Sequence, residues 1–291
     1  MDGELRVMGV ILRATLREGT RRRLLLALGG LSLLAVLLTA WGYAQLPNFG
    51  GGPAGELTRT ELEGIASQLL IVVMFMFSWV VALEAVFAAA PSLAGEVESG
   101  EILAVLARPI SRRAILLGKA AALAAVVLVY TMIAAGLEYV AVWLAIGYLP
   151  PDPVQAGLYI AAEGLVMLVV ALALSTRLAP VTSGIVAMLL FGVAWLGGFV
   201  GGIGHAFDDR VSSGIGAVSQ FILPTDALWR GAIFHLEPPS MLLAGSAAGP
   251  QFAAFPFFAD APPSSAFLAW VGIWVVSLLG LAAWSFGRRD L

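Results

Sequence analysis

Apolar residues are gathered into six long runs, and the segments between the runs carry most of the charges. A hydrocarbon core about 30 Å thick is crossed by about 20 apolar helical residues, and each run is close to or above this length. The runs cover residues 24–46, 65–90, 114–149, 156–174, 181–203 and 265–286. Proline lacks the amide hydrogen that a helix interior needs, and seven prolines fall between runs: Pro91, Pro150, Pro151, Pro153, Pro180, Pro262 and Pro263. The pattern predicts an all-α membrane protein with six transmembrane helices in a single domain over residues 1–291.

The composition agrees with this class and excludes others. Of the 291 residues, 60 % are apolar and 12 % are charged, whereas soluble domains are about 45–50 % apolar and about 25 % charged. Such a chain cannot cover a water-facing surface, which excludes a soluble enzyme and a disordered tail. The net charge of −3 gives no sign of nucleic-acid binding. Because the sequence has no cysteine, thiolate nucleophiles, disulfides and zinc–thiolate sites are excluded as well.

The basic residues are divided unevenly between the two sides of the predicted membrane domain. Six spans place both termini on one side, and 13 of the 16 Lys and Arg residues fall on that side. Only Arg59, Arg210 and Arg230 fall on the other. Because short cytoplasmic segments carry an excess of Lys and Arg, we expect a multi-pass protein of the cell membrane with both termini cytoplasmic.

Residues 1–23, ahead of the first run, combine apolar and basic positions at helical spacing. One face of this helix would carry Leu5, Met8, Leu12 and Leu16, and another would carry Arg13, Arg17 and Arg21. This pattern is typical of an amphipathic helix that lies on the inner leaflet with arginines near lipid phosphates. A solvated, charged lead-in to the first span is the alternative.

Residues 204–264 are too apolar for an ordinary loop and too interrupted for a clean span. We expect short helices that dip into the outer interface or pack on the outer ends of the spans. A seventh and an eighth span are the alternative, and they would place Asp226 and Arg230 in lipid.

Residues 91–113, between the second and third runs, read as a short acidic helix on the cytoplasmic side. Glu96, Glu98 and Glu101 precede Leu103 and Leu106, so apolar residues would anchor this helix on a soluble partner while charges set its register. Arg108-Pro109 would end the helix because the residue before proline disfavours the α conformation, and Ser111 would cap the third span. The alternative is a solvated loop with one helical turn.

At this segment the chain resembles the permease subunits of ABC-2 type ABC transporters, most closely a branch associated with multicopper-enzyme maturation. The matching positions are Glu96, Ser99-Gly100, Ile102-Leu103, Leu106, Arg108-Pro109, Ser111-Arg112 and Gly118-Lys119. Two further stretches are similar to the family, namely residues 223–230 (LPTDALWR) and the basic ending over residues 286–291 (FGRRDL). The resemblance thus touches the whole chain and is most specific in residues 91–119.

The resemblance implies that residues 91–113 form a coupling helix seated in an ATPase subunit. The coupling residues it implies are Glu96, Glu98, Ser99, Gly100, Glu101, Leu103, Leu106, Arg108 and Pro109. It also implies two ATPase subunits that hold ATP and Mg, a second permease copy, most simply a homodimer, and export as the direction. The chain itself lacks the Gly-x-x-x-x-Gly-Lys-Ser/Thr phosphate loop, since Gly118-Lys119 is followed by Ala120 and preceded by Arg113 at the first glycine position. It would therefore bind no cofactor and be no enzyme on its own.

Three carboxylates lie within runs, namely Glu84, Glu138 and Glu163. Charges inside a membrane are costly and tend to be functional. We therefore treat these residues as candidates for a substrate or proton role. Pairing with Ser, Thr or Tyr hydroxyls, or a position at a helix end, is the alternative.

A second group of candidates would form a cleft or gate. The resemblance places the second and fifth spans along a central cleft and the dimer contact. Its candidate residues are Met74, Phe75 and Phe77, together with the small residues Gly197, Gly198, Gly201 and Gly202, which allow close helix approach. Ordinary packing or contact with lipid is the alternative for both sets.

No catalytic or metal-binding arrangement stands out. His205 and His235 are far apart, so we expect loop residues without a metal. Two other functions stay open at this stage: an ATP-independent secondary transporter that uses Glu138 and Glu163, and a membrane scaffold for a cytoplasmic complex. The apolar, Met- and Phe-rich residues of the candidate cleft are compatible with lipids, hydrophobic drugs or peptides as cargo, and they do not exclude a small sulfur-containing or metal-linked species.

Overall fold

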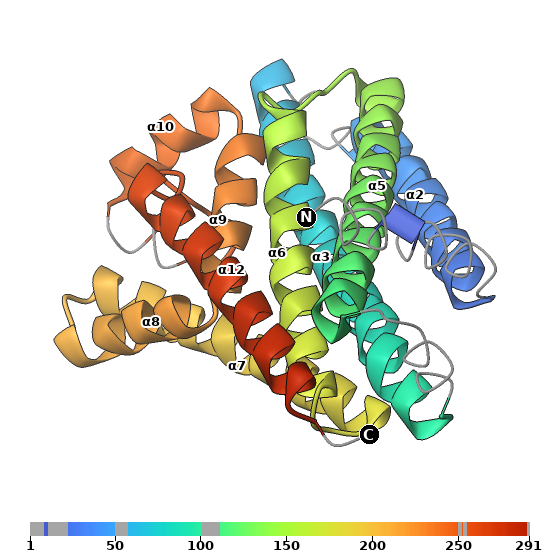
Figure 1. The fold of residues 1–291 in the computed structure, drawn as a ribbon. Helices are drawn as coiled ribbons and strands as arrows, with labels where there is room; N and C mark the ends of the chain where they lie inside the picture. The colour runs from blue at the N-terminus through green and yellow to red at the C-terminus, as the bar shows by residue number, and fades with distance from the viewer. Residues whose placement is uncertain are drawn as a thin grey trace.

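The computed structural model describes residues 9–10, 23–49, 58–100, 111–249, 252 and 255–289. Within these residues, six helices are long and apolar enough to cross a membrane, and no strand occurs (Figure 1). They are α2 (Arg23–Phe49), α3 (Arg59–Glu98), α5 (Arg112–Ile146), α6 (Pro153–Ser175), α7 (Pro180–Ala206) and α12 (Ser265–Gly287). The predicted all-α fold with six spans is confirmed. The amphipathic helix predicted over residues 1–23 lies outside the described residues except at positions 9–10 and 23.

The ends of the helices follow local sequence signals at most positions. Thr58 and Glu61 form a capping box at the start of α3, in which each side chain accepts a hydrogen bond from the other's backbone amide. Ser111 accepts from the Ala114 amide at 3.2 Å, so the predicted cap of the third span is confirmed. At the other end of α5, Gly147 adopts the left-handed conformation (φ 72°) that glycine tolerates best.

The expectation that Pro91 separates two segments is wrong, because α3 continues through Pro91 to Glu98. A proline inside a helix removes one hydrogen bond and crowds the carbonyl four residues earlier. Here buried side chains stand on both sides of it, among them Ala90, Ser92 and Leu93. Their packing holds the helix together across the proline, and α3 is 40 residues long as a result.

Helix α6 is the centre of the bundle. It packs against α3, α5, α7 and α12 among the spans. Of its 23 residues 14 are buried, and the exposed ones lie in its first two turns, as expected for a helix surrounded by others. Helix α2 lies at the periphery (Figure 1) and exposes most of its leucines. Peripheral apolar surface of this kind faces lipid or another protein in a membrane.

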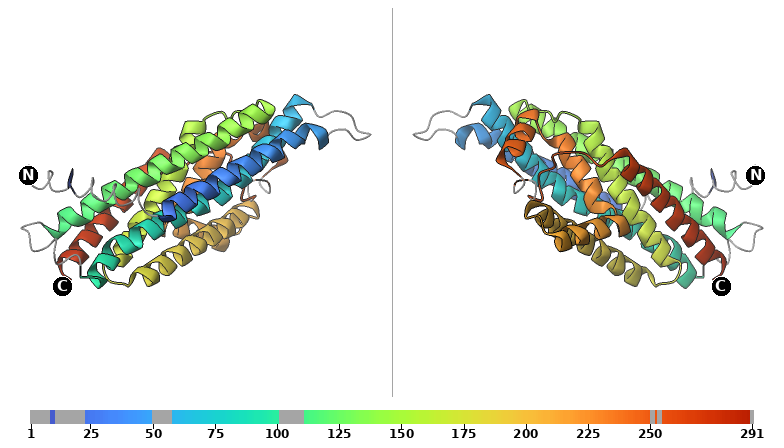
Figure 2. Two further views of the ribbon diagram at one scale, coloured as in Figure 1. Left: turned by 90° about the vertical axis from the view of Figure 1, so that its right-hand side faces the viewer. Right: turned by 90° about the vertical axis from the view of Figure 1, so that its left-hand side faces the viewer.

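The two ends of the bundle differ in charge. The end of α3, the start of α5, the α6–α7 connection and the end of α12 lie together (Figure 2). We call this the basic end, since it carries Arg112, Arg113, Lys119, Arg177, Arg288 and Arg289. The opposite end, called the far end, holds the start of α3 and the α5–α6 connection.

Residues 204–264 form three described helices, α8 (Arg210–Ile222), α9 (Thr225–Leu236) and α10 (Pro239–Ala248), which confirms the expectation of short helices. Helix α8 runs antiparallel to α7, because Gly204 contacts Ser213, Gly201 contacts Gly216 and the Ser219 hydroxyl donates to the Ala194 carbonyl at 3.2 Å. Ala194 stands near the middle of α7, so α8 descends to about half the depth of the bundle.

Helix α9 then returns to the far end. The carbonyl of His235 near its end accepts from the Asp152 amide at 3.3 Å, and the next carbonyl, of Leu236, accepts from the Tyr148 hydroxyl at 2.9 Å. Helices α8 and α9 therefore form a hairpin, called the re-entrant hairpin, whose tip at Leu223–Pro224 lies inside the bundle. Neither helix is among those long and apolar enough to cross a membrane.

Candidate functional site

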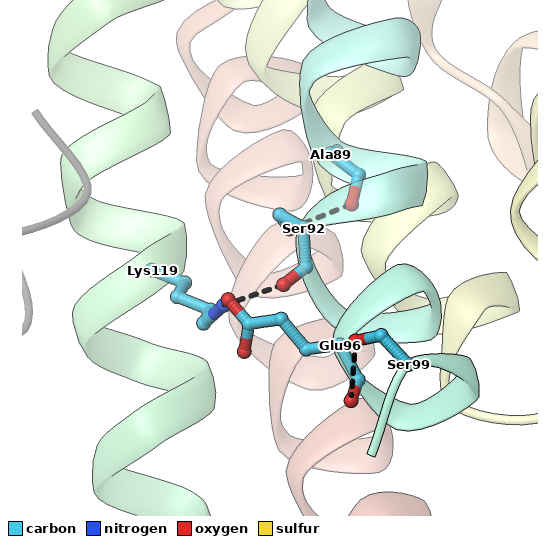
Figure 3. A network of polar contacts seen from close by, with 5 residues as sticks. All are labelled: Ala89, Ser92, Glu96, Ser99 and Lys119. Carbon is cyan, nitrogen blue, oxygen red and sulfur yellow. Dashed lines mark hydrogen bonds and ion pairs between the residues drawn. The ribbon is translucent and has the colours of Figure 1, made fainter. Parts of the chain in front are cut away.

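The side chain of Lys119 on α5 joins the basic end of α3 to α5 (Figure 3). Its ammonium donates to the Ser92 carbonyl at 2.5 Å and forms an ion pair with the Glu96 carboxylate. The Ser92 hydroxyl in turn donates to the Ala89 carbonyl at 2.7 Å. Lys119 is buried and the Glu96 side chain is 24 % exposed, so the pair lies at the edge of the protein interior.

This ion pair is a structural connection between two helices. Removing one partner of a fully buried pair costs about 3–5 kcal/mol, because the other charge remains without compensation. The cost is lower here, since solvent reaches Glu96. An apolar cluster of Leu93, Ile115, Leu116 and Phe286 adds α12 to the same contact. The basic end of α3 is therefore fixed to α5 and α12 over its last two turns.

The Ser99-Gly100 pair ends α3 beyond this connection. The Ser99 amide donates to the Gly95 carbonyl at 2.9 Å, and Gly100 adopts a left-handed conformation (φ 75°), which is a common way to terminate a helix. Glu98 and Ser99 are exposed. Of the predicted coupling residues, Glu96, Glu98, Ser99 and Gly100 are thus placed at one helix end, whereas Glu101, Leu103, Leu106, Arg108 and Pro109 lie outside the described residues.

Arginines of the basic end bind backbone carbonyls of neighbouring helices. Arg112 donates to the Arg289 carbonyl, and Arg289 donates to the Thr176 carbonyl at 3.0 Å. Arg177 donates to the Ser285 hydroxyl at 2.9 Å and to its carbonyl at 3.2 Å. These bonds link α5, α6 and α12 where the helices end. At the basic end, the ends of these three helices are therefore held together by hydrogen bonds.

A second polar group lies at the tip of the re-entrant hairpin. One carboxylate oxygen of Asp226 accepts from the Gln220 amide at 2.8 Å and from Arg230 Nε at 3.1 Å, and Arg230 also donates to the Gly198 carbonyl at 3.4 Å. Asp226 is buried. Glu163 on α6 is buried beside Ser78, within electrostatic range of Asp226. The hairpin tip thus places two acids and one arginine near half depth.

The glycines proposed for a gate make their close contacts within this chain. A Cβ on Gly198 would lie 2.0 Å from the Asp226 carboxyl carbon, and a Cβ on Gly201 would lie 2.6 Å from the Gly216 Cα. Gly197 faces the Ser219 side chain in the same way, and Gly202 is buried. The small residues of α7 therefore seat the re-entrant hairpin, and the close approach expected of them is made to α8 and α9.

The aromatic and methionine candidates are divided between the core and a cavity. The Phe75 ring lies 5.2–5.4 Å from the rings of Trp195, Trp229 and Phe257, measured between centroids. These contacts join α3, α7, α9 and the segment before α12. Met74 and Phe77, in contrast, line a cavity between α2, α3 and α5.

The remaining intramembrane acids are buried. Glu138 accepts a hydrogen bond from the Thr39 hydroxyl at 2.9 Å and lines the same cavity as Met74. Within the described part of the chain, neither carboxylate oxygen of Glu84 has a hydrogen-bond partner. Glu138 thus shows the hydroxyl pairing that the sequence left open, and Glu84 does not.

Both histidines lie on helices, His205 in the last turn of α7 and His235 in the last turn of α9, so the expectation that they are loop residues is wrong. His235 Nδ1 lies 3.2 Å from the Asp152 carboxylate, and its ring stacks on Tyr159. In the ranges that the structure covers, no group of three His, Asp or Glu side chains is arranged to hold a metal ion.

Two residues of these sites were missed by sequence reasoning. Lys119 was noted only as part of a Gly-Lys pair, although it is the partner of Glu96, and the two residues lie on different helices. Gln220, which binds Asp226, stands in a segment without a distinctive motif. The Asp226–Arg230 pair has the four-residue spacing of a helical ion pair, which was the available signal.

Comparison with known proteins supports the same class. The family model described as "ABC-2 family transporter protein" matches residues 10–291. The chain is also similar to a protein of Pseudomonas aeruginosa named "Probable ABC transporter permease protein NosY", with 28 % identity over 309 aligned residues that cover 98 % of this chain and 99 % of the relative. Because the family match includes all six membrane-spanning helices and both polar sites, the chain belongs to the ABC-2 transporter family as a membrane-spanning subunit.

Proposed function

We propose that this subunit forms half of an ATP-driven exporter, in which two permease copies assemble with two separate ATPase subunits. The ATPase binds at the basic end through the exposed end of α3 at Glu98-Ser99 and through the segment that follows it up to residue 113, which serves as the coupling segment. ATP and Mg belong to the ATPase subunit. The observation that carries the proposal is the Glu96–Lys119 ion pair, since it joins the helix end from which the coupling segment emerges to the next membrane span.

With the Glu96–Lys119 ion pair in place, a movement of the coupling segment can reach the membrane domain by two routes. One route is α5, through Lys119. The other is α3 itself, a 40-residue helix whose Phe75 packs on Trp229 of the re-entrant hairpin. Rigid helices that are packed together move as bodies. Closure of the ATPase subunits would therefore displace the basic ends of α3 and α5 together and alter the packing at the hairpin tip.

The charge distribution supports a cytoplasmic location for the basic end. Arg and Lys are concentrated there, as the positive-inside rule requires of a cytoplasmic side. ATP is available on that side. Export is the direction that the family resemblance implies, and a homodimer is the simplest assembly.

Charge reversal separates a positioning role from direct docking. The chain is co-expressed with an ABC ATPase encoded beside it, purified as a complex and assayed for ATP hydrolysis in lipid nanodiscs. Glu96→Lys and Lys119→Glu should each reduce hydrolysis about tenfold, because each places two like charges together. The double variant Glu96→Lys/Lys119→Glu restores the pair in reverse and should recover most of the activity.

Glu98→Lys is the matched control, since Glu98 is exposed two residues away and makes no ion pair within the described residues. If Glu98 touches the ATPase subunit, the Glu98→Lys variant should change the yield of co-purified ATPase. Adding Lys119→Glu to this variant should not restore the yield, because Glu98 is not the partner of Lys119. Full hydrolysis by both single variants would contradict the coupling role. Transport driven by a proton gradient without any ATPase subunit would contradict the whole proposal.

A further inference from the structure

A cavity of about 350 Å³ lies between α2, α3 and α5. Its wall is almost entirely apolar and includes Leu31 and Val36 of α2, Met74 and Phe77 of α3, and Ala134 of α5. The volume lies within the range of small-molecule binding sites, about 300–1,000 Å³, and such sites combine an apolar wall with few polar groups. The cavity is therefore large enough for a small organic molecule.

One end of this cavity is polar. Glu138 lines it and is only 4 % exposed. Its Oε2 atom accepts from the Thr39 hydroxyl, whereas its Oε1 atom is buried and has no hydrogen-bond partner within the described residues. The hydroxyls of Tyr43 and Tyr139, within electrostatic range of Glu138, are buried and without partners in the same way.

This polar end contains an acid and no base. Among the described residues, no Lys, Arg or His forms an ion pair with Glu138. A lone carboxylate in hydrocarbon is costly, and a lipid acyl chain in the cavity would leave it uncompensated. An ammonium group supplies a positive charge and hydrogen-bond donors. In the cavity it would pair with the carboxylate of Glu138, the charged residue among those that line it, whose Oε1 atom has no partner within the described residues. Tyr43 and Tyr139 lie near Glu138 but do not line the cavity.

We propose that this cavity binds an apolar amine that enters from the bilayer. The hydrocarbon part of the molecule fills the space between α2, α3 and α5, and its ammonium group pairs with Glu138. The wall itself marks the route, since Leu31, Leu38, Val72 and Met76 line the cavity and are also exposed on the membrane-facing surface. The proposal is independent of the ATPase and of the coupling segment.

The test uses three photoreactive probes that differ only in the head group. Decylamine, decanol and decanoic acid, each with a diazirine in the chain, are added to the purified full-length chain in nanodiscs of uncharged phosphatidylcholine. Cross-linked peptides are identified by mass spectrometry. Decylamine should label α2, α3 and α5 saturably, and at least tenfold more strongly than decanol or decanoic acid.

Two variants and one control decide the role of the cavity. Glu138→Gln removes the charge and should weaken decylamine labelling at least tenfold. Glu84→Gln, which removes another buried carboxylate that does not line the cavity, should leave labelling unchanged. Ala35→Phe fills the cavity from an exposed position on α2 and should abolish labelling with Glu138 intact.

Because Ala35 is exposed, the fold should tolerate its substitution. Ala35→Phe therefore still tests the proposal if Glu138→Gln fails to fold. Equal labelling by decylamine and decanol would show a lipid-like site and overturn the proposal. Absence of saturable decylamine labelling in the wild type, or full labelling of Ala35→Phe, would overturn it too.

Discussion

Gly198 of α7 lies directly against the carboxylate of Asp226, so closely that a Cβ at position 198 would stand 2.0 Å from the carboxyl carbon. The Gly198 carbonyl also accepts a hydrogen bond from Arg230 at 3.4 Å. The backbone of a membrane-spanning helix is thereby in contact with both charges of the re-entrant hairpin. Only glycine leaves room for this arrangement.

Replacing Gly198 with alanine should displace the hairpin from α7. Overpacking of a close contact typically costs about 1–3 kcal/mol, and the obstacle here includes a hydrogen-bonded carboxylate. Gly272→Ala in α12 is the matched control, since a Cβ there meets nothing within 4 Å. Thermal unfolding in detergent should show a lower midpoint for Gly198→Ala and an unchanged or higher midpoint for Gly272→Ala. Equal midpoints for the two variants would contradict the contact.

Loss of the Arg230 charge should destabilise the hairpin tip. The Asp226 side chain is 5 % exposed and that of Arg230 is 20 % exposed, so Arg230→Met leaves a buried carboxylate with Gln220 as its remaining partner. We expect a loss of about 3 kcal/mol. The double variant Asp226→Asn/Arg230→Met should recover part of it, because no charge is then left unpaired. Arg210→Met, at an exposed position on α8, is the control, and unfolding midpoints of the four proteins form the measurement.

The six spans could be predicted because their signal is local. A run of about 20 apolar residues has few alternatives once the composition excludes a soluble surface. Pro91 shows the limit of that logic: the residue weakens a helix locally, yet packing by Ala90 and Leu93 maintains it, and such packing depends on other helices. The sequence also predicted short helices in residues 204–264, but the antiparallel packing of α8 along α7 was not predicted, since it depends on contacts such as Gly201 with Gly216.

The candidate sites likewise combine features that the local sequence indicates with features that depend on packing between helices. Glu96 was identified from its neighbours in the sequence, but its position is determined by Lys119, 23 residues away on another helix. The acids Glu84, Glu138 and Glu163 stood out because a charge is rare in an apolar run. Helix packing determines which of these acids has a hydrogen-bond partner, which lines a cavity and which has neither. The apolar runs of the sequence do not contain this information.

Burial of Glu237 should make stability depend on pH. Burial raises the pKa of this carboxyl from 4.5 to about 8; Asp260 adds to the rise and the Ala259 backbone reduces it. Between these pKa values the folded chain holds a proton that the unfolded chain has released. The free energy of unfolding therefore falls as pH rises through this window, by at most about 1.4 kcal/mol per pH unit.

Glu237→Gln removes this proton and should be more stable than the wild type at pH 8, with the difference shrinking towards pH 5. Glu98→Gln is the control, because Glu98 is exposed to solvent, and it should follow the wild type. Unfolding midpoints in detergent between pH 5 and pH 9 provide the measurement. A constant difference between Glu237→Gln and the wild type across this range would show that the carboxyl does not titrate there.

The orientation of the bundle can be tested with single cysteines, because the natural sequence has none. Ala179 is exposed in the α6–α7 connection at the basic end, and Ala261 is exposed before α12, which starts at the other end. A membrane-impermeant maleimide added to intact cells should label Ala261→Cys and leave Ala179→Cys unlabelled. Inside-out vesicles should give the reverse result. Labelling of Ala179→Cys in intact cells would place the basic end outside, where ATP is not supplied, and would remove the basis for an ATPase partner at that end.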